Sequence, residues 1–160
     1  MISIISLKGT GVRLLALKFE KDKITKLSSE IFNAIEKLNE LSSLSRADFL
    51  SDPHKVASAK YFLIVGIEAS IDMCNHLISK NRFRAPEDYA DTFRVMREAG
   101  AFSDEFVEKL KEMAKFRNRL VHIYWEVDDE VIFDILNEDI QDFNEFVRMF
   151  MEFISKNADR

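Results

Sequence analysis

Apolar residues recur along most of the chain at steps of three and four, the spacing that gathers them on one face of an α-helix. The first such stretch begins at Lys21 and continues to Leu41. Its apolar positions are Ile24, Leu27, Ile31, Ile35 and Leu38. Residues 1–20 show neither helix caps nor clear periodicity. We therefore predict an N-terminal extension over residues 1–20 and a first amphipathic helix from Lys21 onward.

The second helix has the clearest start signal. Asp52 followed by Pro53 is an N-cap with a first-turn proline, and no other Gly or Pro occurs before Gly66. The pattern predicts a long helix that ends near Lys80. Because residues 61–71 in its middle are apolar almost all round, this helix should pack on more than one side and form the centre of the fold.

The remainder of the chain predicts further helices. One begins at Pro86 and ends near Gly100, and the next is capped by Ser103 and continues to Val127, where acidic residues mark a break. A last acidic helical region follows, and its apolar stripe extends to Ile154.

Composition supports a helical fold. Four Gly and two Pro make six of 160 residues, or about 4%, against a usual share of roughly 12%. So few of these residues leave few tight turns, which disfavours an all-β fold and a Rossmann unit. Hydrophobic residues make up 47% of the chain, enough for a core. We expect one all-α domain over residues 21–157, an up-down bundle of four to five helices.

Other compositional features bear on the cellular location of the chain and on its partners. The one cysteine, Cys74, cannot form an internal disulfide, and no apolar run approaches 18 residues, so we expect a cytoplasmic chain without a membrane span. The net charge is −5, but it is unevenly distributed. Residues 120–160 hold 3 basic and 11 acidic side chains, which gives −8, and this region should therefore meet a different partner from the rest of the chain.

The most basic helix face lies around the segment FRNRLVHIYW. On an ideal helix Arg117 and Tyr124 are seven residues apart and share a stripe, whereas His122 lies about 140° from Arg117. The three side chains therefore converge only where the end of the helix meets another helix or a second subunit. This geometry predicts a cleft or a dimer seam.

These residue types suit chemistry on RNA. A histidine, whose ordinary pKa lies near neutrality, can accept a proton from a ribose 2′-hydroxyl or donate one to a leaving oxygen, and an arginine can stabilise the charge of a phosphorane. Such a mechanism needs no metal. We therefore consider His122 and Arg117 as catalytic residues, with Lys115 and Arg119 as RNA-contact candidates. The alternative is that His122 and Tyr124 are half-buried helix-end residues and Arg117 is a surface cation.

A second group of polar residues lies on the central helix. Glu68, Asp72 and Asn75 are four and three residues apart and share one face. Carboxylates on an otherwise apolar helix favour a nearby cation, so Asp72 or Glu68 would orient the guanidinium of Arg117. These residues could instead form the solvent face of the helix. A metal site at Glu68, Asp72 and His76 is disfavoured, because bundle metal sites draw ligands from several helices.

Three further features each suggest a role. Lys80, Arg82 and Arg84 complement the C-terminus of the central helix or form the rim of an RNA path, and the first interpretation is favoured. Trp125 belongs to the core or a dimer interface, or else stacks on a base. Cys74 lies between apolar neighbours and is expected in the core.

The sequence also resembles a known family. The pattern Arg-x4-His-x-Tyr, late in a domain of four to five helices, is filled by Arg117, His122 and Tyr124. This arrangement resembles the HEPN superfamily. Together with the segment 68–76 and the acidic last helices, the phrase RNRLVHIYWEVD is similar to the HepT-like toxin family over most of residues 21–156.

The resemblance implies a homodimeric, metal-independent endoribonuclease toxin that needs no cofactor and pairs with an MNT-type nucleotidyltransferase antitoxin. It places Arg117 and His122 in an active site at the dimer interface and makes Tyr124 the target of adenylylation by the antitoxin. The negative charge of residues 120–160 separately suggests that acidic residues such as Asp139 and Asp142 dock a basic antitoxin surface. The alternative is a non-catalytic helical partner or nucleotide-binding module of a nucleotidyltransferase, with Arg117 and Tyr124 as contact residues.

Overall fold

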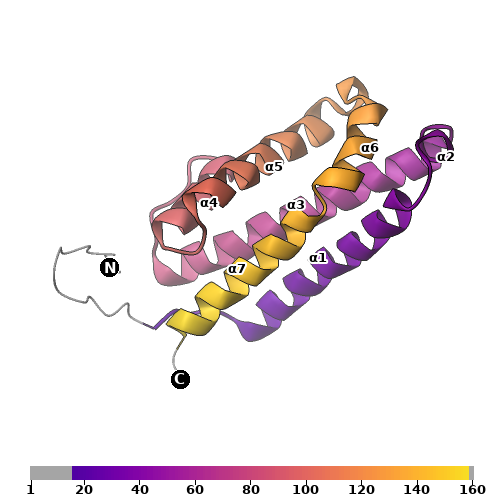
Figure 1. Cartoon of the computed structure of the whole chain (residues 1–160). Helices are drawn as coiled ribbons and strands as arrows, with labels where there is room; N and C mark the ends of the chain where they lie inside the picture. Colours follow the sequence, from indigo (N-terminus) through magenta and orange to yellow (C-terminus); the bar gives the residue numbers. More distant parts are fainter. Residues whose placement is uncertain (1–15, 159–160) are drawn as a thin grey trace.

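A computed structural model describes residues 16–158, and within this range the chain is all-α, as predicted. Seven α-helices and one 3-10 turn follow one another without a strand in the described residues (Figure 1). Their order is α1 (Lys21–Ser42), α2 (Arg46–Leu50), α3 (Pro53–Asn81), α4 (Tyr89–Glu98), α5 (Asp104–His122), η1 (Tyr124–Glu126), α6 (Asp129–Glu138) and α7 (Gln141–Asn157).

The central helix is α3. The Asp52 side chain accepts a hydrogen bond from the N–H of His54, and Pro53 follows the cap, so the helix begins where the sequence predicts. α1 lies along one side of α3 in the opposite direction, and α4 and α5 lie on another side (Figure 1). By length and composition α3 could cross a membrane, but 61% of its apolar window is buried among the other helices. Its hydrophobicity is that of a core helix.

Large aromatic side chains form one end of the core. Phe93 of α4 packs edge-on against Phe146 of α7, with ring centroids 6.2 Å apart, and Phe102 packs between α4, α5 and α7. Midway along the bundle, Phe143 of α7 lies so close to Gly66 of α3 that a Cβ at position 66 would meet the ring at 2.9 Å. Glycine is favoured there because the ring of Phe143 packs directly against the backbone of α3.

The segment that precedes α1 is tied to the bundle from Leu17 onward. The side-chain amide of Asn81 binds both the N–H and the carbonyl of Lys18, and the N–H of Glu20 donates to Nε2 of His76. The N–H of Leu17 donates to the carbonyl of Asn157. Part of the predicted extension, residues 16–20, is therefore bound to α3 and α7. Residues 1–15 lie outside the described residues.

Several helix boundaries differ from the prediction. α4 begins at Tyr89 rather than Pro86, because Asp88 is the residue whose side chain caps the helix by accepting from the N–H of Asp91. The predicted end of this helix is confirmed, since Gly100 has a φ of 96° directly after the C-cap. The number of helices exceeds the predicted four to five, since the short α2 lacked a periodic pattern.

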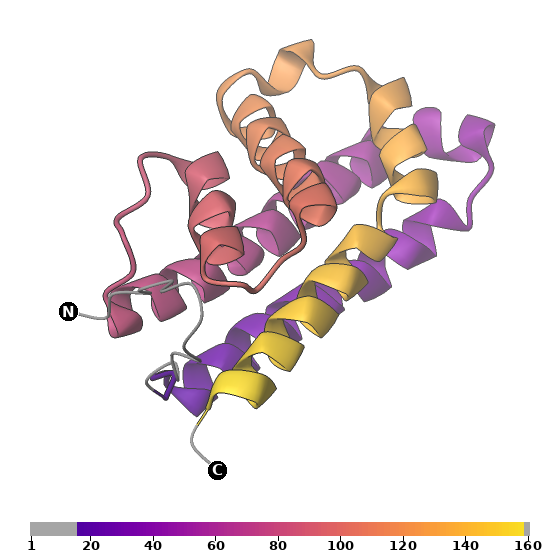
Figure 2. The ribbon, with the colours of Figure 1, turned by 60° about the vertical axis from the view of Figure 1, so that its left-hand side comes forward.

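The C-terminal third also contains more breaks than predicted. α5 ends at His122 instead of continuing to Val127, because Ile123 leaves the helical region with φ −134° and ψ 43°. The final acidic region is divided into α6 and α7 around Asp139. α5 and α7 diverge from one another along the bundle (Figure 2).

Candidate functional site

Arg117 is held by side chains from three helices. Its Nε and Nη2 donate to Oε1 of Glu68 on α3 at 3.1 and 2.6 Å, and its Nη1 donates to Oδ1 of the neighbouring Asn118 at 3.2 Å. Its Cζ lies 4.8 Å from the ring centroid of Tyr89, the first residue of α4. Only 14% of the Arg117 side chain is exposed. The guanidinium is therefore a fixed and largely covered group.

The structure distinguishes the two carboxylates that the sequence left open. Glu68 contacts Arg117, whereas Asp72 makes no hydrogen bond or ion pair with Arg117 in the described range. Partial desolvation and the charge of Glu68 raise the pKa of Asp72. Asn75, the third polar residue of this face, accepts a hydrogen bond from Thr92 at 3.4 Å and so connects α3 to α4.

His122 and Tyr124 lie beyond this cluster. His122 is the last residue of α5 and is exposed, and no hydrogen bond joins it to Arg117 in the described residues. Tyr124 begins η1, and its ring lies over Nζ of Lys60 on α3 at 4.3 Å from the centroid. Lys60 is only 5% exposed and pairs with Asp129 of α6 at 3.0 Å. The arginine of the motif is therefore held against α3 and α4, whereas its histidine is exposed at the end of α5.

A different edge of α5 leads to His122. Lys115, Arg119 and His122 are spaced by four and three residues, so they share one edge of the helix, and all three are exposed. Lys115 pairs with Glu112 at 2.7 Å, and Arg119 has no ion pair in the described range. The two RNA-contact candidates thus lie on the side of His122 and not on the side of Arg117.

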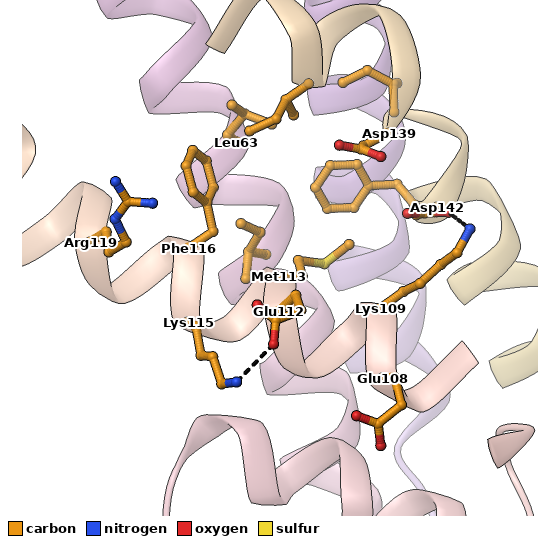
Figure 3. A pocket seen from close by; sticks show the side chains of 14 residues that line it. Leu63, Glu108, Lys109, Glu112, Met113, Lys115, Phe116, Arg119, Asp139 and Asp142 are labelled. Carbon is orange, nitrogen blue, oxygen red and sulfur yellow. Dashed lines mark hydrogen bonds and ion pairs between the residues drawn. The ribbon is translucent and has the colours of Figure 1, made fainter. Parts of the chain in front are cut away.

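A groove of about 510 Å³ opens next to this edge, between α3, α5 and the start of α7 (Figure 3). Its floor is apolar and is formed by Leu63, Ile67, Met113, Phe116, Ile135, Ile140 and Phe143. Lys115 and Arg119 lie along its α5 rim, and Asp139 and Asp142 lie along the opposite rim. Burial and the nearby Asp142 carboxylate raise the pKa of Asp139. Glu108, Lys109 and Glu112 also line the α5 side, where Lys109 pairs with Asp142 and Lys115 pairs with Glu112. The α5 side of the groove therefore carries charges of both signs, and the opposite side is acidic.

The remaining sequence candidates have structural roles. Nε2 of His76 already accepts a hydrogen bond from Glu20, and no three His, Cys, Asp or Glu side chains within residues 16–158 are grouped to hold a metal ion. Cys74 is buried in the core as predicted, and burial raises the pKa of its thiol. Arg84 binds Asp91 and Glu98 of α4, and Lys80 pairs with Glu20, so these two cations of the basic run are held by carboxylates.

Three residues depart from expectation. Trp125 is 77% exposed, so its assignment to the core is wrong, and an interface or a stacking role remains. Lys60 was not predicted, although it is the only lysine or arginine between Val56 and Ser79, and an isolated cation in a long apolar stretch is a readable signal. No signal in the sequence pointed to Tyr89.

Comparison with known proteins supplies the family. The sequence model of the family described as "Ribonuclease HepT-like" matches residues 31–150, which is 120 of the 160 residues. The chain belongs to the HepT-like ribonuclease family. The predicted resemblance is therefore confirmed, and the Arg-x4-His-x-Tyr segment lies inside the matched range.

Two HepT relatives carry nuclease names. The mRNA nuclease HepT of Shewanella oneidensis is 26% identical over 80 residues, which span 50% of this chain and 60% of that protein. The matched region thus covers less than two thirds of the Shewanella nuclease. The tRNA nuclease HepT of Aphanizomenon flos-aquae is 24% identical over 123 residues, 75% of this chain and 82% of that protein.

Solved structures show the same fold. A tri-AMPylated HEPN toxin of Shewanella oneidensis, in complex with an MNT antitoxin, superposes with a TM-score of 0.77 at 22% identity, covering 83% of this chain and 99% of that one. The cytosolic protein YutE of Bacillus subtilis gives a TM-score of 0.72 at 15% identity, covering 89% and 94%. At these identities the likeness establishes the HepT-like helical fold.

Proposed function

We propose that this chain is a metal-independent endoribonuclease toxin of a toxin–antitoxin pair, which acts on RNA as a homodimer. The observation that carries the proposal is the fixed Arg117 guanidinium, five residues from an exposed His122, in a chain of the HepT-like ribonuclease family. The two nuclease relatives and the HEPN toxin with the same fold support it.

The proposed reaction uses the two side chains in different ways. His122 accepts the proton of a ribose 2′-hydroxyl, the 2′-oxygen attacks the adjacent phosphorus, and the bond to the 5′-oxygen of the next nucleotide breaks. Arg117 stabilises the extra negative charge of the phosphorane. A protonated histidine returns a proton to the leaving 5′-oxygen. The products are a 2′,3′-cyclic phosphate and a 5′-hydroxyl end.

The proposed path of the RNA follows the basic edge of α5. Lys115 and Arg119 are exposed and lead toward His122 at the end of the helix. Phosphate groups bound along this edge would bring the backbone to His122. The opposite rim of the groove carries Asp139 and Asp142, which repel phosphate. RNA is therefore expected along the edge of α5 and outside the groove.

A homodimer accounts for the separation of the motif. Arg117 faces α3 and α4, whereas His122 is exposed at the end of α5, so the two do not meet in one subunit. Exposed apolar side chains, Val121, Tyr124 and Trp125, surround His122 in the sequence and suit a protein interface. A second copy packed against this end would complete the site.

Regulation by the antitoxin is proposed at Tyr124. Its ring is 40% exposed and rests on the buried Lys60, so the side chain is accessible yet held in place. A nucleotidyltransferase that transfers AMP to its hydroxyl would add bulk and negative charge two residues from His122, which would block the RNA path. The AMPylated HEPN toxin with an MNT antitoxin supports this partner.

The acidic rim of the groove is a proposed antitoxin surface. Asp139 and Asp142 stand above an apolar floor, a combination suited to a basic amphipathic segment of the partner. Charge reversal at both positions should weaken antitoxin binding, and unchanged binding would contradict this assignment.

A cytoplasmic location is also proposed for this chain. The cytosolic protein YutE, which has the same fold, supports this location.

The decisive experiment is RNA cleavage by the purified protein in the presence of a chelator. Wild type should cleave RNA and leave 2′,3′-cyclic phosphate ends, His122→Ala should not, and the exposed histidine variant His54→Ala should match wild type. Equal cleavage by wild type and His122→Ala would overturn the catalytic assignment. An inactive wild type that still binds the nucleotidyltransferase would favour the non-catalytic partner instead.

Modification has its own test. Co-expression with the proposed MNT-type nucleotidyltransferase antitoxin should add increments of about 329 Da, the mass of AMP less water, to wild type. Tyr124→Phe should remain unmodified, and Tyr61→Phe, another exposed tyrosine, should be modified like wild type. An unmodified wild type beside an active transferase would contradict the proposed regulation.

A further inference from the structure

Tyr89 contacts Arg117, but it belongs neither to the Arg-x4-His-x-Tyr motif nor to the polar group of Glu68, Asp72 and Asn75 on α3. It is the first residue of α4, and its ring centroid lies 4.8 Å from Cζ of Arg117, 28 positions further along the chain. A guanidinium at this distance from an aromatic face is attracted by the negative charge density of the ring. Tyr89 is 40% exposed, so burial in the core does not by itself account for its position.

The backbone of Tyr89 is fixed by its neighbours. Asp88 caps the helix, and the buried Asp91 accepts two hydrogen bonds from Arg84, at 2.7 and 2.9 Å, and one from the N–H of Glu87. Thr92 donates to Asn75 of α3. These contacts anchor the first turn of α4 on both sides of Tyr89, so the ring holds a defined position relative to α3.

Tyr89 and Glu68 constrain different features of the same guanidinium. Glu68 binds one edge, through Nε and Nη2, and this ion pair alone allows the plane to tilt about that edge. Cζ of Arg117 also lies over the ring of Tyr89, and this second contact restricts that freedom. Of the five N–H donors of an arginine, three are used by Glu68 and Asn118 in the described residues, which leaves two for a ligand.

We propose that Tyr89 is a positioning residue for Arg117, whose ring fixes the plane of the guanidinium so that its remaining N–H donors point at the phosphate of the RNA. This inference rests on the proposed ribonuclease function. Preorganised donors stabilise a developing charge better than donors that must reorient during the reaction. Loss of the ring should therefore act on the chemical step more than on RNA binding.

The first test is steady-state cleavage of a defined RNA. Tyr89→Leu should lower kcat about tenfold and leave KM nearly unchanged, and Tyr89→Phe should retain kcat because it keeps the ring face. Phe32→Leu, which removes an exposed ring from α1, is the matched control and should equal wild type. A raised KM with unchanged kcat would show that Tyr89 binds a base instead and would overturn the proposal.

A second series guards against misfolding of the leucine variant. Phenylalanine with one, two and three ring fluorines at position 89 keeps the shape of the side chain while it weakens attraction for a cation. kcat should fall stepwise along this series. A merely structural role predicts equal kcat for all three, and that result would overturn the proposal.

A measurement that does not depend on RNA cleavage tests the role of Tyr89 independently of the proposed function. In ¹⁵N-arginine NMR, Arg117 should give a slowly exchanging Nε–H signal, identified by its absence in Arg117→Lys. The signal should persist in Tyr89→Phe and broaden in Tyr89→Leu. If wild type cleaves no RNA, the ribonuclease proposal fails, and this signal still decides whether Tyr89 holds Arg117. An unaltered signal in Tyr89→Leu would overturn the inference in either case.

Discussion

Arg117 and His122 are five residues apart on α5, yet their surroundings are opposite. Arg117 belongs to a clamped side, formed with Glu68 and Tyr89, where the guanidinium is bound on one edge by Glu68 and lies over the ring of Tyr89. His122 belongs to an open end, formed with Tyr124 and Trp125, where the side chains are exposed. The chain itself therefore fixes the arginine, whereas the histidine is free to meet the proposed second copy.

The supports of the two regions differ in the same way. Behind the clamped side, the buried Asp91 ties the start of α4 to Arg84. At the open end, a 3-10 turn of three residues follows the last turn of α5, and the contact of Tyr124 with Lys60 holds it. Changes on the clamped side should therefore cost both stability and activity, and changes at the open end should cost activity with little effect on stability.

The largest effect is expected from the two motif residues. Arg117→Ala and His122→Ala should each lower kcat by about 10²- to 10⁴-fold, the usual range for a lost acid–base or charge-stabilising group. Only Arg117→Ala should also lower Tm, because it leaves Glu68 without its cation and Tyr89 without its packing partner. Cleavage assays and thermal unfolding of both variants measure this. An equal loss of Tm in His122→Ala would break the comparison.

Removal of the buried carboxylate should have the next largest effect. Asp91→Ala removes a buried carboxylate that accepts hydrogen bonds from Arg84, Arg94 and the N–H of Glu87, and loss of such charge-assisted hydrogen bonds costs about 2 kcal/mol in the free energy of unfolding. Asp104→Ala is the matched control, since Asp104 pairs with Arg97 but is 87% exposed. Urea unfolding of both variants should separate them clearly. Equal stabilities would show that α4 is not anchored through Asp91.

A fall in pH should weaken the contact between Asp91 and Arg84 that holds the start of α4. Hydrogen bonds from Arg84 hold the pKa of Asp91 well below its usual range. The carboxylate therefore stabilises the fold above its unfolded-state pKa of about 3.9, and this contribution is lost as the pH falls from there toward the folded-state pKa. Between about pH 5 and pH 2, the free energy of unfolding should fall more steeply for wild type than for Asp91→Asn. Parallel curves would contradict this assignment.

The smallest effect on stability is expected at Trp125. Because this side chain is 77% exposed, Trp125→Ala should change the free energy of unfolding by no more than about 0.5 kcal/mol. Self-association should weaken, since an exposed tryptophan next to Tyr124 suits a dimer seam. Sedimentation measures the association and urea unfolding the stability. A large loss of stability would mean that the open end is part of the folded core.

The sequence predicted the fold where the helix signals were local. Asp52 with Pro53 and Ser103 mark true helix starts, because capping depends on residues within one turn. The division between α6 and α7 was missed because the apolar stripe continues across Asp139 without a change of period. α2, with five residues, is too short to show a period at all.

The sequence identified most residues of the candidate site, but it did not predict which of them contact one another. Spacing named Arg117 together with both Glu68 and Asp72, but two carboxylates one turn apart share a helix face, and only packing decides which meets the cation. Tyr89 was beyond reach, because its contact with Arg117 depends on how α4 crosses α5. Tertiary geometry, which local pattern does not encode, supplied these pairings.

The hydrogen bond from Leu17 to Asn157 brings the two ends of the described range together, at 2.7 Å between nitrogen and oxygen. This junction lies at the opposite end of the bundle from η1 (Figure 1). Domains whose ends meet tolerate circular permutation, so the chain could be rejoined there and reopened in a surface loop. Immobilisation through that junction would also leave the proposed RNA path facing solution, a useful orientation for single-molecule measurements of cleavage.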